Sequence, residues 1–412
     1  MFNSETQAGE VKILGKKGNW TLLLNGEPFY IKGVGCGKHT GSRGEDYLKM
    51  AKELGANTVR TWGTDQGTQD YLDKAHEYGL MVIAGIWLNY SDGGYYSYIS
   101  GNDYMESKKQ EIIDYVNKFK NHPAILMWGI GNEVINFTHS EEERVAFCKF
   151  LNKIIKIVHK LDPHHPVMYV SADTTAIPYV KKYVPALDII GMNVYGNIQI
   201  SHNKCISVLN IPYIITEYGP PGYWDRPKDQ NGMSIEPQDY EKAIWYRDHT
   251  RQIHRLRGYN LGGVAHFLGE LTEETLTWWN INYSRYKTAS FNMLKLLYTG
   301  CPVSNEAPVI RSFELSKTNN IKPGEKIDVS VKATDPEEDT LSYNYTLSSP
   351  ESSYLQFTMH KEIPIKVIGK GSFAKVVIPD DIDNGIYRLY VFVTDEQGNV
   401  ATTNKSINIS GR

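Results

Sequence analysis

Two stretches of sequence, AILMWGIGNEV (residues 124–134) and PYIITEYG (residues 212–219), decide the fold. Each is a short apolar run that ends in polar residues, and each carries a glutamate at that end, Glu133 and Glu217. A run that is apolar on both faces is typical of a strand in a parallel sheet that helices cover on both sides. The two stretches therefore predict parallel strands whose carboxyl ends present acidic side chains.

The same pattern repeats along the chain, with amphipathic helical stretches between the apolar runs. Eight parallel strands alternating with helices are the signature of a closed β/α barrel. We therefore predict the α/β class, with a (β/α)8 TIM barrel over residues 28–300. The eight runs are FYIKGVG (29–35), NTVRTWG (57–63), LMVIAGIWL (80–88), AILMWGIGNEV (124–134), PVMYVSAD (166–173), LDIIGMNVYG (187–196), PYIITEYG (212–219) and GGVAHFL (262–268).

One helix is predicted in detail, between the fourth and fifth runs. Ser140 and Glu143 form a capping-box pattern at its start, and Pro163 ends it. A second helix is predicted from Met105 to about Phe119. The apolar stripe of the first helix recurs at helical spacing through Phe147, Phe150, Leu151, Ile154, Ile155, Val158 and Leu161.

Both ends of the chain differ in character from the barrel. Residues 1–27 contain a hairpin pattern with turns at Gly18-Asn19 and Asn25-Gly26, which we expect to close the amino-terminal mouth of the barrel. Residues 301–306 read as a linker, and residues 307–412 as an immunoglobulin-like β-sandwich. The sandwich strands predicted are KIDVSVKAT, LSYNYTL, FAKVVIP, YRLYVFVTD and ATTNKSINI.

Composition excludes several classes of protein. The 412 residues carry a net charge of -3 without a basic stripe, so a nucleic-acid partner is not expected. No apolar run is long enough to span a bilayer. The 28 tyrosines and eight tryptophans are many beside twelve phenylalanines, which suits sugar binding, although tyrosine also packs in cores. The four scattered cysteines predict free thiols, and neither a disulfide scaffold nor a zinc site.

Glu133 and Glu217 form the pair that carries the predicted chemistry. Glycosidic bonds are cleaved by two carboxyl groups on opposite sides of the bond, which stand roughly 5–5.5 Å apart in retaining enzymes. The fourth and seventh strands face each other across a closed barrel, so the pair can meet this requirement. The alternative is that either glutamate is an ion-pair partner at the barrel mouth.

The runs also resemble a known group of enzymes, the clan A glycoside hydrolases. LNGEPFYIKGVG, LGANTVRTWG, LDKAHEYGLMVIAGIWL, GIGNEV, DIIGMNVYG and PYIITEYGPPG are similar to glycoside hydrolase family 2 catalytic barrels and to the fungal-type β-1,3-glucanosyltransferases. The resemblance covers about residues 20–270. It implies that Glu133 is the general acid/base and Glu217 the nucleophile.

Further roles are carried over by position from the same resemblance. Arg60 would hold the carboxylate of the nucleophile, Asn132 would bond the 2-hydroxyl of the sugar, and Tyr195 would orient Glu217. Each residue also has an ordinary structural explanation: an ion pair for Arg60, bonds to loop backbone for Asn132, and packing on the barrel core for Tyr195. A nearby Arg and a Tyr hydroxyl would keep Glu217 ionised, which fits the nucleophile.

Aromatic residues after strand ends are candidate sugar platforms. Tyr90 follows the third strand, Trp224 the seventh and Trp278 the eighth. Clan A barrels usually end strand eight in an aromatic residue, whereas His266 stands at that place here. Packing in the core is the alternative for these aromatic residues. Others of the same kind are Tyr95, Tyr96, Tyr98, Tyr104, Tyr223 and Trp279.

No metal ligand or other cofactor is predicted. Asp65, Asp173 and Glu270 also lie at the barrel mouth, where helix capping explains an Asp equally well. His164 and His165 are interpreted as turn residues on the opposite face. The turns near Asp335 and Asp395 could bind calcium, but solvated turns are favoured.

The sequence thus predicts a retaining hydrolase or transglycosidase acting on a β-linked glucan or a related oligosaccharide or polysaccharide. The alternative is a catalytically weak carbohydrate-binding or cell-surface protein, which the presence of both carboxylates, Arg60 and Asn132 disfavours. A metal-dependent barrel hydrolase ranks third. The first ten residues, MFNSETQAGE, lack a signal-peptide pattern. The architecture nevertheless favours an extracellular or periplasmic location for a mature chain.

Overall fold

The computed structural model describes residues 9–91, 96–138, 140–354 and 357–411, and these form two compact units. Unit 1 comprises residues 1–40, 46–218 and 249–266, and unit 2 comprises residues 41–45, 219–248 and 267–412.

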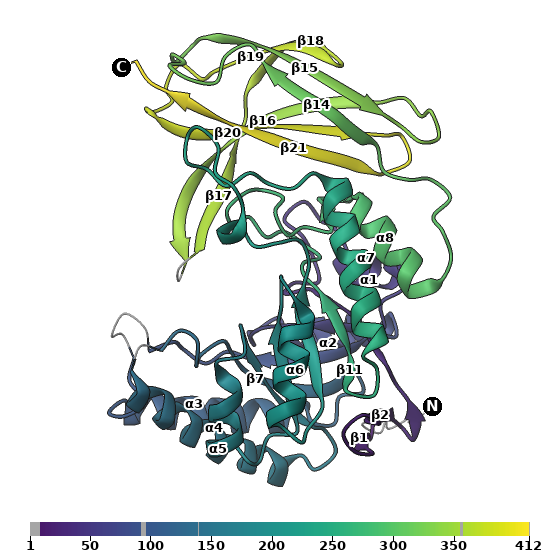
Figure 1. Cartoon of the computed structure of the whole chain (residues 1–412), viewed down its shortest axis with the longest axis vertical. Coiled ribbons are helices and arrows are strands. Elements are labelled where there is room, and N and C mark those ends of the chain that lie inside the picture. The colour runs from purple at the N-terminus through teal and green to yellow at the C-terminus, as the bar shows by residue number, and fades with distance from the viewer. Residues whose placement is uncertain (1–8, 92–95, 139, 355–356, 412) are drawn as a thin grey trace. The chain divides into compact units, whose positions relative to one another are not determined.

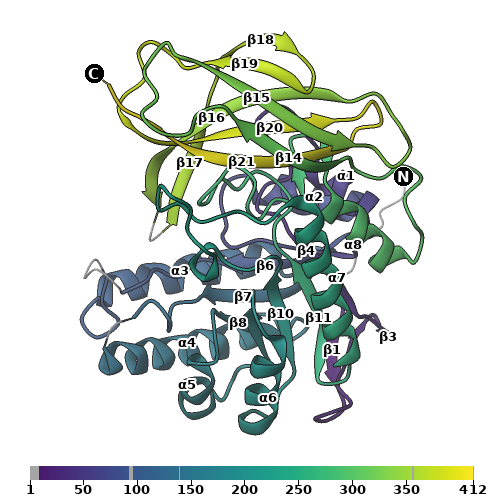
Figure 2. The same cartoon turned by 45° about the horizontal axis from the view of Figure 1, so that its top comes forward.

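Unit 1 contains a closed barrel of eight parallel strands in the order β10-β11-β4-β5-β6-β7-β8-β9 (Figures 1 and 2). Seven strands lie within predicted apolar runs and the eighth, β11, begins two residues before its run, so the predicted barrel is confirmed. The strands are β4 (Ile31–Gly35), β5 (Thr58–Arg60), β6 (Met81–Ile86), β7 (Ile125–Asn132), β8 (Val167–Ser171), β9 (Ile189–Asn193), β10 (Tyr213–Tyr218) and β11 (Asn260–Ala265).

Helices follow the barrel strands, and Figure 2 shows α3 to α6 outside them. The predicted cap of α4 is confirmed, because Ser140 Oγ accepts a hydrogen bond of 3.1 Å from Glu143 N. Within the described residues, no helix has the length and apolar character needed to cross a membrane. The helices are α1 (Tyr47–Leu54), α2 (Thr68–Glu77), α3 (Asn102–Phe119), α4 (Glu141–Leu161), α5 (Ala176–Tyr183), α6 (Ile198–Val208), α7 (Asp239–Arg255), which crosses from unit 2 into unit 1, and α8 (Ala289–Thr299) in unit 2.

A small antiparallel sheet precedes the barrel and packs against its core. Strands β1 (Val11–Leu14), β2 (Thr21–Leu24) and β3 (Glu27–Pro28) form an antiparallel sheet. Val11 and Leu22 join the apolar core made by the barrel strands. The closure of the amino-terminal mouth by residues 1–27 stays a prediction.

The amino-terminal face of the barrel holds a buried polar cluster around Asp162. Its carboxylate accepts hydrogen bonds of 2.8 Å from Trp128 Nε1 and pairs at 2.8 Å with His165 Nδ1. Burial raises the pKa of Asp162, but His165 and the Trp128 indole more than compensate, and the net pKa is lowered. His165 therefore serves this turn, as predicted.

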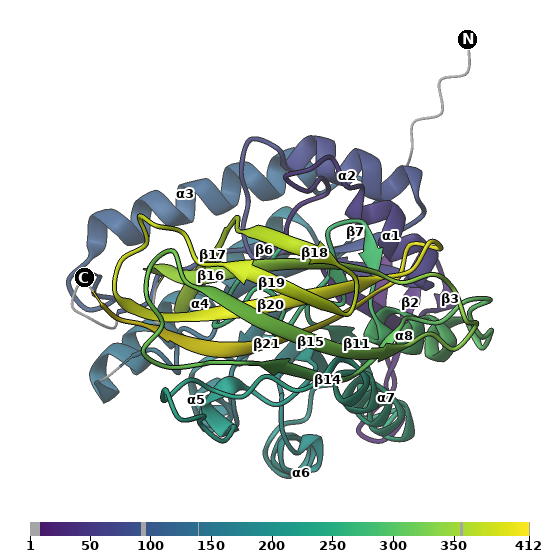
Figure 3. The same cartoon turned by 90° about the horizontal axis from the view of Figure 1, so that it is seen from above.

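Unit 2 contains two four-stranded sheets packed face to face, seen edge-on in Figure 1 and from above in Figure 3. One sheet has the order β14-β15-β19-β18 and the other β17-β16-β20-β21, and their facing residues share one apolar core. The predicted two-layer β structure is thus present, while its immunoglobulin-like class stays a prediction. The strands are β14 (Val309–Leu315), β15 (Lys326–Thr334), β16 (Ser342–Tyr354), β17 (Phe357–Ile363), β18 (Lys366–Lys370), β19 (Phe373–Val377), β20 (Gly385–Thr394) and β21 (Val400–Ile409).

The outer face of the β17-β16-β20-β21 sheet is also covered. Arg388 Nη2 donates to Ser234 O at 3.0 Å, and Thr402 N donates to Asp239 Oδ2 at 2.6 Å. Leu276 N donates to the hydroxyl of Tyr390 at 3.0 Å. Residues of the segments 219–248 and 267–300 thus contact this sheet, and both segments belong to unit 2 together with residues 301–412.

We expect Asp162→Ala to lower the free energy of unfolding by about 3 kcal/mol, since it leaves the Trp128 indole and the His165 ring buried without their acceptor. Thermal unfolding followed by far-UV circular dichroism measures the effect. Asp73→Ala is the matched control, because Asp73 pairs with His122 at 3.1 Å but is 59% exposed. Such a surface pair contributes less than about 1 kcal/mol. Equal losses in the two variants would contradict this account of Asp162.

Candidate active site

The carboxyl ends of four barrel strands bring the candidate residues of unit 1 together. Arg60 is the last residue of β5, Asn193 is the last of β9, and Glu217 lies one residue before the end of β10. Glu133 directly follows β7. Both predicted catalytic residues, Glu133 and Glu217, therefore lie on the barrel face where βα loops begin, as expected.

Glu217 is buried and held by three donors. Its Oε1 accepts hydrogen bonds from Arg60 Nη1 and from Trp62 Nε1, both at 2.9 Å. Its Oε2 accepts a bond of 2.7 Å from the hydroxyl of Tyr195. A carboxylate that accepts this many bonds has a fixed orientation and a stabilised negative charge.

The pKa of Glu217 is lowered in spite of its burial. Burial raises this pKa, while the interaction with His266 in its protonated form, the charge of Arg60 and the bonds from Tyr195 and Trp62 lower it by more. His266 Nδ1 lies 3.7 Å from Glu217 Oε2, but burial and Arg60 lower the pKa of His266 to about 4 in spite of the nearby carboxylate. His266 is therefore neutral at pH 7, where Arg60 and the two other donors keep Glu217 ionised.

Glu133 adopts an uncommon backbone conformation, with φ of 58°. Gly131 before it has φ of 78°, and a Cβ there would lie 3.3 Å from Leu88 and 3.4 Å from the Tyr169 ring. The pairing of β7 with β8 shifts register between Gly129 and Asn132. This irregular strand end brings Glu133 Oε1 to 2.6 Å from Asn193 Nδ2, which donates to it. Strain of this kind persists where the surrounding structure fixes it, commonly at functional sites.

Arg60 connects the two carboxylates through a buried network. Its guanidinium donates to Glu217, to Thr216 O at 2.9 Å and to Asn132 Oδ1 at 2.7 Å. Asn193 Nδ2 donates to both Glu133 Oε1 and, at 3.3 Å, Asn132 Oδ1. Asn132 Oδ1 thus accepts twice, while no hydrogen bond of Asn132 Nδ2 is found among the described residues. The amide is oriented to offer a donor.

Trp62 and Asn193 are members of this network that the sequence interpretation omitted. Trp62 lies two residues after Arg60, and Asn193 two residues before Tyr195, so each pair shares a side of its extended segment. The alternation of side chains along an extended segment was therefore the sequence signal from which Trp62 and Asn193 could have been found. Gly35 makes room for the indole, since a Cβ at residue 35 would lie 2.7 Å from Trp62 Cη2.

The aromatic residues predicted as sugar platforms differ in their exposure. Trp278 in unit 2 is 0% exposed, and its Nε1 donates to Pro221 O, so it offers no ring face to a substrate and packing explains it. Tyr90 in unit 1 is buried and stacks on Phe137 with ring centroids 4.7 Å apart. Trp224 in unit 2 is 53% exposed, as a platform would be. Tyr95 lies outside the described residues.

The rings of Trp62, Tyr195 and His266 lie around Glu217, and the ring of His266 contacts the other two. His266 lies edge-on to Trp62 at 5.7 Å and to Tyr195 at 5.9 Å between ring centroids. His266 therefore fills the place at the end of strand eight where the resemblance leads one to expect an aromatic side chain.

The two acidic turns of the sandwich carry the bonds of ordinary turns. Asp335 Oδ1 accepts from Glu337 N and Asp339 N, and Asp395 Oδ1 accepts from Gln397 N and Asn399 N. Carboxylate oxygens of Asp335, Asp339 and Asp395 lie within 4.8 Å of one another. The turn hydrogen bonds account for two of these aspartates.

Comparison with known proteins places the barrel in a family. Residues 16–254 match the model of the family "Glycosyl hydrolases family 2, TIM barrel domain". Because this match covers more than half of the chain, the chain belongs to glycosyl hydrolase family 2. The family 2 part of the predicted resemblance is thereby confirmed, and the resemblance to fungal glucanosyltransferases is not among these findings.

Curated relatives are longer than this chain. The β-glucuronidase of Homo sapiens is 26% identical over 282 residues, which cover 62% of this chain and 41% of that protein. The β-galactosidase BoGH2A of Bacteroides ovatus is 27% identical over 264 residues, covering 54% and 30% respectively. The chain thus spans about two-fifths of the curated glucuronidases that it matches.

Solved structures show a similar fold. The β-D-glucuronidase of Dictyoglomus thermophilum gives a TM-score of 0.55 at 19% identity, over 71% of this chain and 54% of that one. A putative β-galactosidase of Bacteroides fragilis gives a TM-score of 0.51 at 17% identity, over 98% and 58%. At these identities the likeness extends to the fold alone.

We expect Tyr195→Phe to raise the pKa of Glu217, because it removes one of the donors that lower it. The acid limb of the kcat/KM–pH profile then moves to higher pH, and kcat/KM at neutral pH falls about tenfold or more. The measurement is a pH–rate profile on an aryl β-glycoside. Tyr179→Phe is the control, since Tyr179 donates to the exposed carboxylate of Glu141. An acid limb that stays in place in Tyr195→Phe would show that the hydroxyl does not tune Glu217.

Proposed function

We propose that this chain is a retaining glycoside hydrolase that cleaves β-glycosidic bonds by double displacement. The observation that carries the proposal is the state of Glu217: a buried carboxylate kept ionised by Arg60, Tyr195 and Trp62. A nucleophile needs this state, and a merely structural glutamate does not need three donors at a strand end. Membership in family 2 supports the same reaction class.

In the first step Glu217 attacks the anomeric carbon of the bound sugar. The bond from that carbon to the leaving oxygen breaks, and Glu133 gives its proton to this oxygen, so that a glycosyl ester on Glu217 remains. In the second step Glu133 takes a proton from water, whose oxygen attacks the same carbon and releases Glu217. Two inversions give net retention of the β configuration.

The supporting residues have distinct tasks in this scheme. Arg60 and Trp62 share Oε1 of Glu217 and Tyr195 holds Oε2, so the carboxylate is presented without having to reorganise. Asn193 fixes Glu133 through its Oε1. The amide of Asn132, oriented by its two bonds through Oδ1, is the donor proposed for the sugar 2-hydroxyl.

For the substrate, we propose a β-linked glucan or a related oligosaccharide, as the sequence suggests. The relatives named as β-glucuronidases and a β-galactosidase make β-glucuronides and β-galactosides the competing substrates. Hydrolysis is favoured over sugar transfer, because two of the aromatic residues expected to hold an acceptor, Tyr90 and Trp278, are buried. Polysaccharide substrates also support the extracellular or periplasmic location proposed from the sequence.

We expect Glu217→Ala and Glu133→Ala each to lower kcat about a thousandfold or more on the best substrate of a panel. The panel contains aryl β-D-glucosides, β-D-glucuronides and β-D-galactosides, and β-1,3- and β-1,4-linked glucans. Glu142→Ala is the matched control, since Glu142 is exposed at the start of α4. Its activity should equal that of the wild type.

Azide distinguishes the two roles. In Glu217→Ala azide replaces the missing nucleophile and gives the α-glycosyl azide, and in Glu133→Ala it attacks the glycosyl ester and gives the β-glycosyl azide. Anomeric proton NMR reads both products. An α-configured first product from the wild type, or full activity of either glutamate variant, would overturn the proposal; products longer than the substrate would show transfer instead of hydrolysis.

A further inference from the structure

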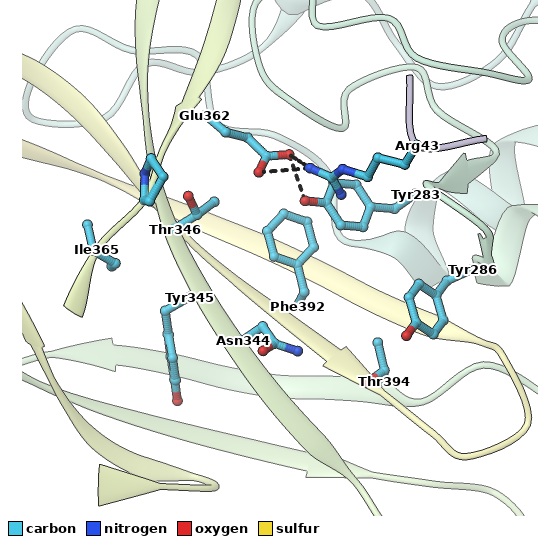
Figure 4. A pocket seen from close by; sticks show the side chains of 11 residues that line it. Arg43, Tyr283, Tyr286, Asn344, Tyr345, Thr346, Glu362, Ile365, Phe392 and Thr394 are labelled. Atoms are coloured by element: carbon cyan, nitrogen blue, oxygen red, sulfur yellow. Dashed lines mark hydrogen bonds and ion pairs between the residues drawn. The ribbon is translucent and has the colours of Figure 1, made fainter. Parts of the chain in front are cut away.

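Unit 2 contains a cavity of about 340 Å³ that the proposed mechanism does not use (Figure 4). It lies between the hairpin of β12 (Asn282–Tyr283) and β13 (Tyr286–Lys287) and the outer face of β16 and β20. A second cavity of about 260 Å³ shares three of its lining residues, Arg43, Tyr283 and Glu362. The two cavities are therefore neighbours on either side of this group of three.

The three shared residues, Arg43, Tyr283 and Glu362, form a wall whose charges compensate each other. Arg43 Nη2 donates to both oxygens of Glu362, at 3.2 and 3.3 Å, and the hydroxyl of Tyr283 donates to Glu362 Oε1 at 2.8 Å. The ring of Tyr283 stacks on Phe392 with centroids 4.0 Å apart. Because Glu362 compensates the charge of Arg43, this wall does not favour an anion over a neutral ligand.

The remaining walls of the first cavity offer unused hydrogen-bonding groups beside an aromatic ring. The side chains of Asn344 and Thr394 line the cavity, and no hydrogen bond of theirs is found among the described residues. Figure 4 shows Thr394 beside Tyr286 and Asn344 below Phe392, both away from Arg43 and Glu362. An amide, a hydroxyl and a partly exposed tyrosine suit a ligand with neighbouring hydroxyls and a C–H face.

The second cavity adds one buried polar atom without a partner among the described residues. Glu270, Asn280 and His360 line it. His360 is 3% exposed, its Nδ1 lies 3.2 Å from Ser348 Oγ, and its Nε2 has no hydrogen-bond partner among the described residues. Burial, together with the charge of Arg388, lowers the pKa of His360 to about 4, so the ring is neutral at pH 7. A buried polar atom without a partner is costly unless a ligand or water satisfies it.

We propose that the two cavities form a glycan-binding site in unit 2 that holds adjacent neutral sugar residues. None of its lining residues belongs to the Glu133–Glu217 network. The identity of the ligand as a glucan rests on the proposed function of the barrel; the site itself rests on the cavities, the balanced Arg43–Glu362 pair and the unused polar groups. Holding one part of a polymer raises the effective concentration of its other bonds near the enzyme.

The test is affinity electrophoresis of the whole chain in native gels that contain soluble β-1,3-glucan, β-1,4-linked glucan or an acidic glucuronan. All proteins carry Glu217→Ala, so that the glycan is not consumed. Asn344→Ala and Tyr286→Ala change the cavity from exposed or partly exposed positions. Tyr240→Ala is the matched control, because Tyr240 belongs to unit 2, is 46% exposed and lies outside both cavities.

We expect a neutral glucan to retard the parent protein and Tyr240→Ala equally, and the apparent Kd to rise about fivefold to tenfold in Asn344→Ala and in Tyr286→Ala. Without Glu217→Ala, the same two variants should keep the wild-type kcat/KM on an aryl glycoside. Equal retardation of all four proteins, or no retardation by any neutral glucan, overturns the glycan site. An inactive wild type that is still retarded through these two residues overturns only the proposed hydrolysis.

Discussion

The site depends on one buried cation. The guanidinium of Arg60 lies inside the barrel mouth, where an uncompensated charge would be very unfavourable. Glu217 supplies the opposite charge, and Asn132 and Thr216 accept the remaining bonds. The same contacts that make Arg60 tolerable orient the nucleophile and turn the amide of Asn132 outward. The hydrogen bonds of Arg60 thus both stabilise the folded barrel and preorganise the active site, so a change in these bonds affects both.

The geometry of the barrel explains why so few residues suffice. Parallel strands end at one face, so side chains far apart in sequence converge there without long loops. The irregular end of β7 then turns Glu133 toward Asn193 on β9, while Glu217 on β10 faces Arg60 on β5. Asn193 contacts both halves of the site, because it donates to Glu133 and to Asn132 and accepts from Arg60, and it thereby helps to couple the two carboxylates.

Much of this arrangement could be predicted from the sequence. Runs that are apolar on both faces, such as residues 124–134, are typical of a parallel sheet that helices cover on both sides. This pattern predicted all eight strands. The two glutamates followed from their places at the strand ends. Trp62 and Asn193 were omitted because a Trp or an Asn near a strand end has many ordinary explanations, and only the three-dimensional contacts single these two out.

Other features lay beyond sequence reasoning for physical reasons. Whether Trp278 is a platform or packing depends on what covers it, which local sequence does not record. The compact units could not be predicted because buried bonds such as those of Arg388 with Ser234 join residues far apart in sequence. Composition indicates a change of secondary structure near residue 307. It does not reveal which earlier segments pack with the β-sandwich that follows this residue.

The division into units has a consequence for how the chain is made. The polypeptide passes between the units at residues 40/41, 45/46, 218/219, 248/249 and 266/267. Synthesis from the N-terminus therefore completes every barrel strand once Ala265 has emerged, while residues 219–248 still lack the sheet that covers them. Asp239, which is buried in the finished protein, lacks its hydrogen bond from Thr402 until β21 has been synthesised. The segments of unit 2 that come early in the sequence therefore gain the sheet that covers them only after β20 and β21 have been synthesised.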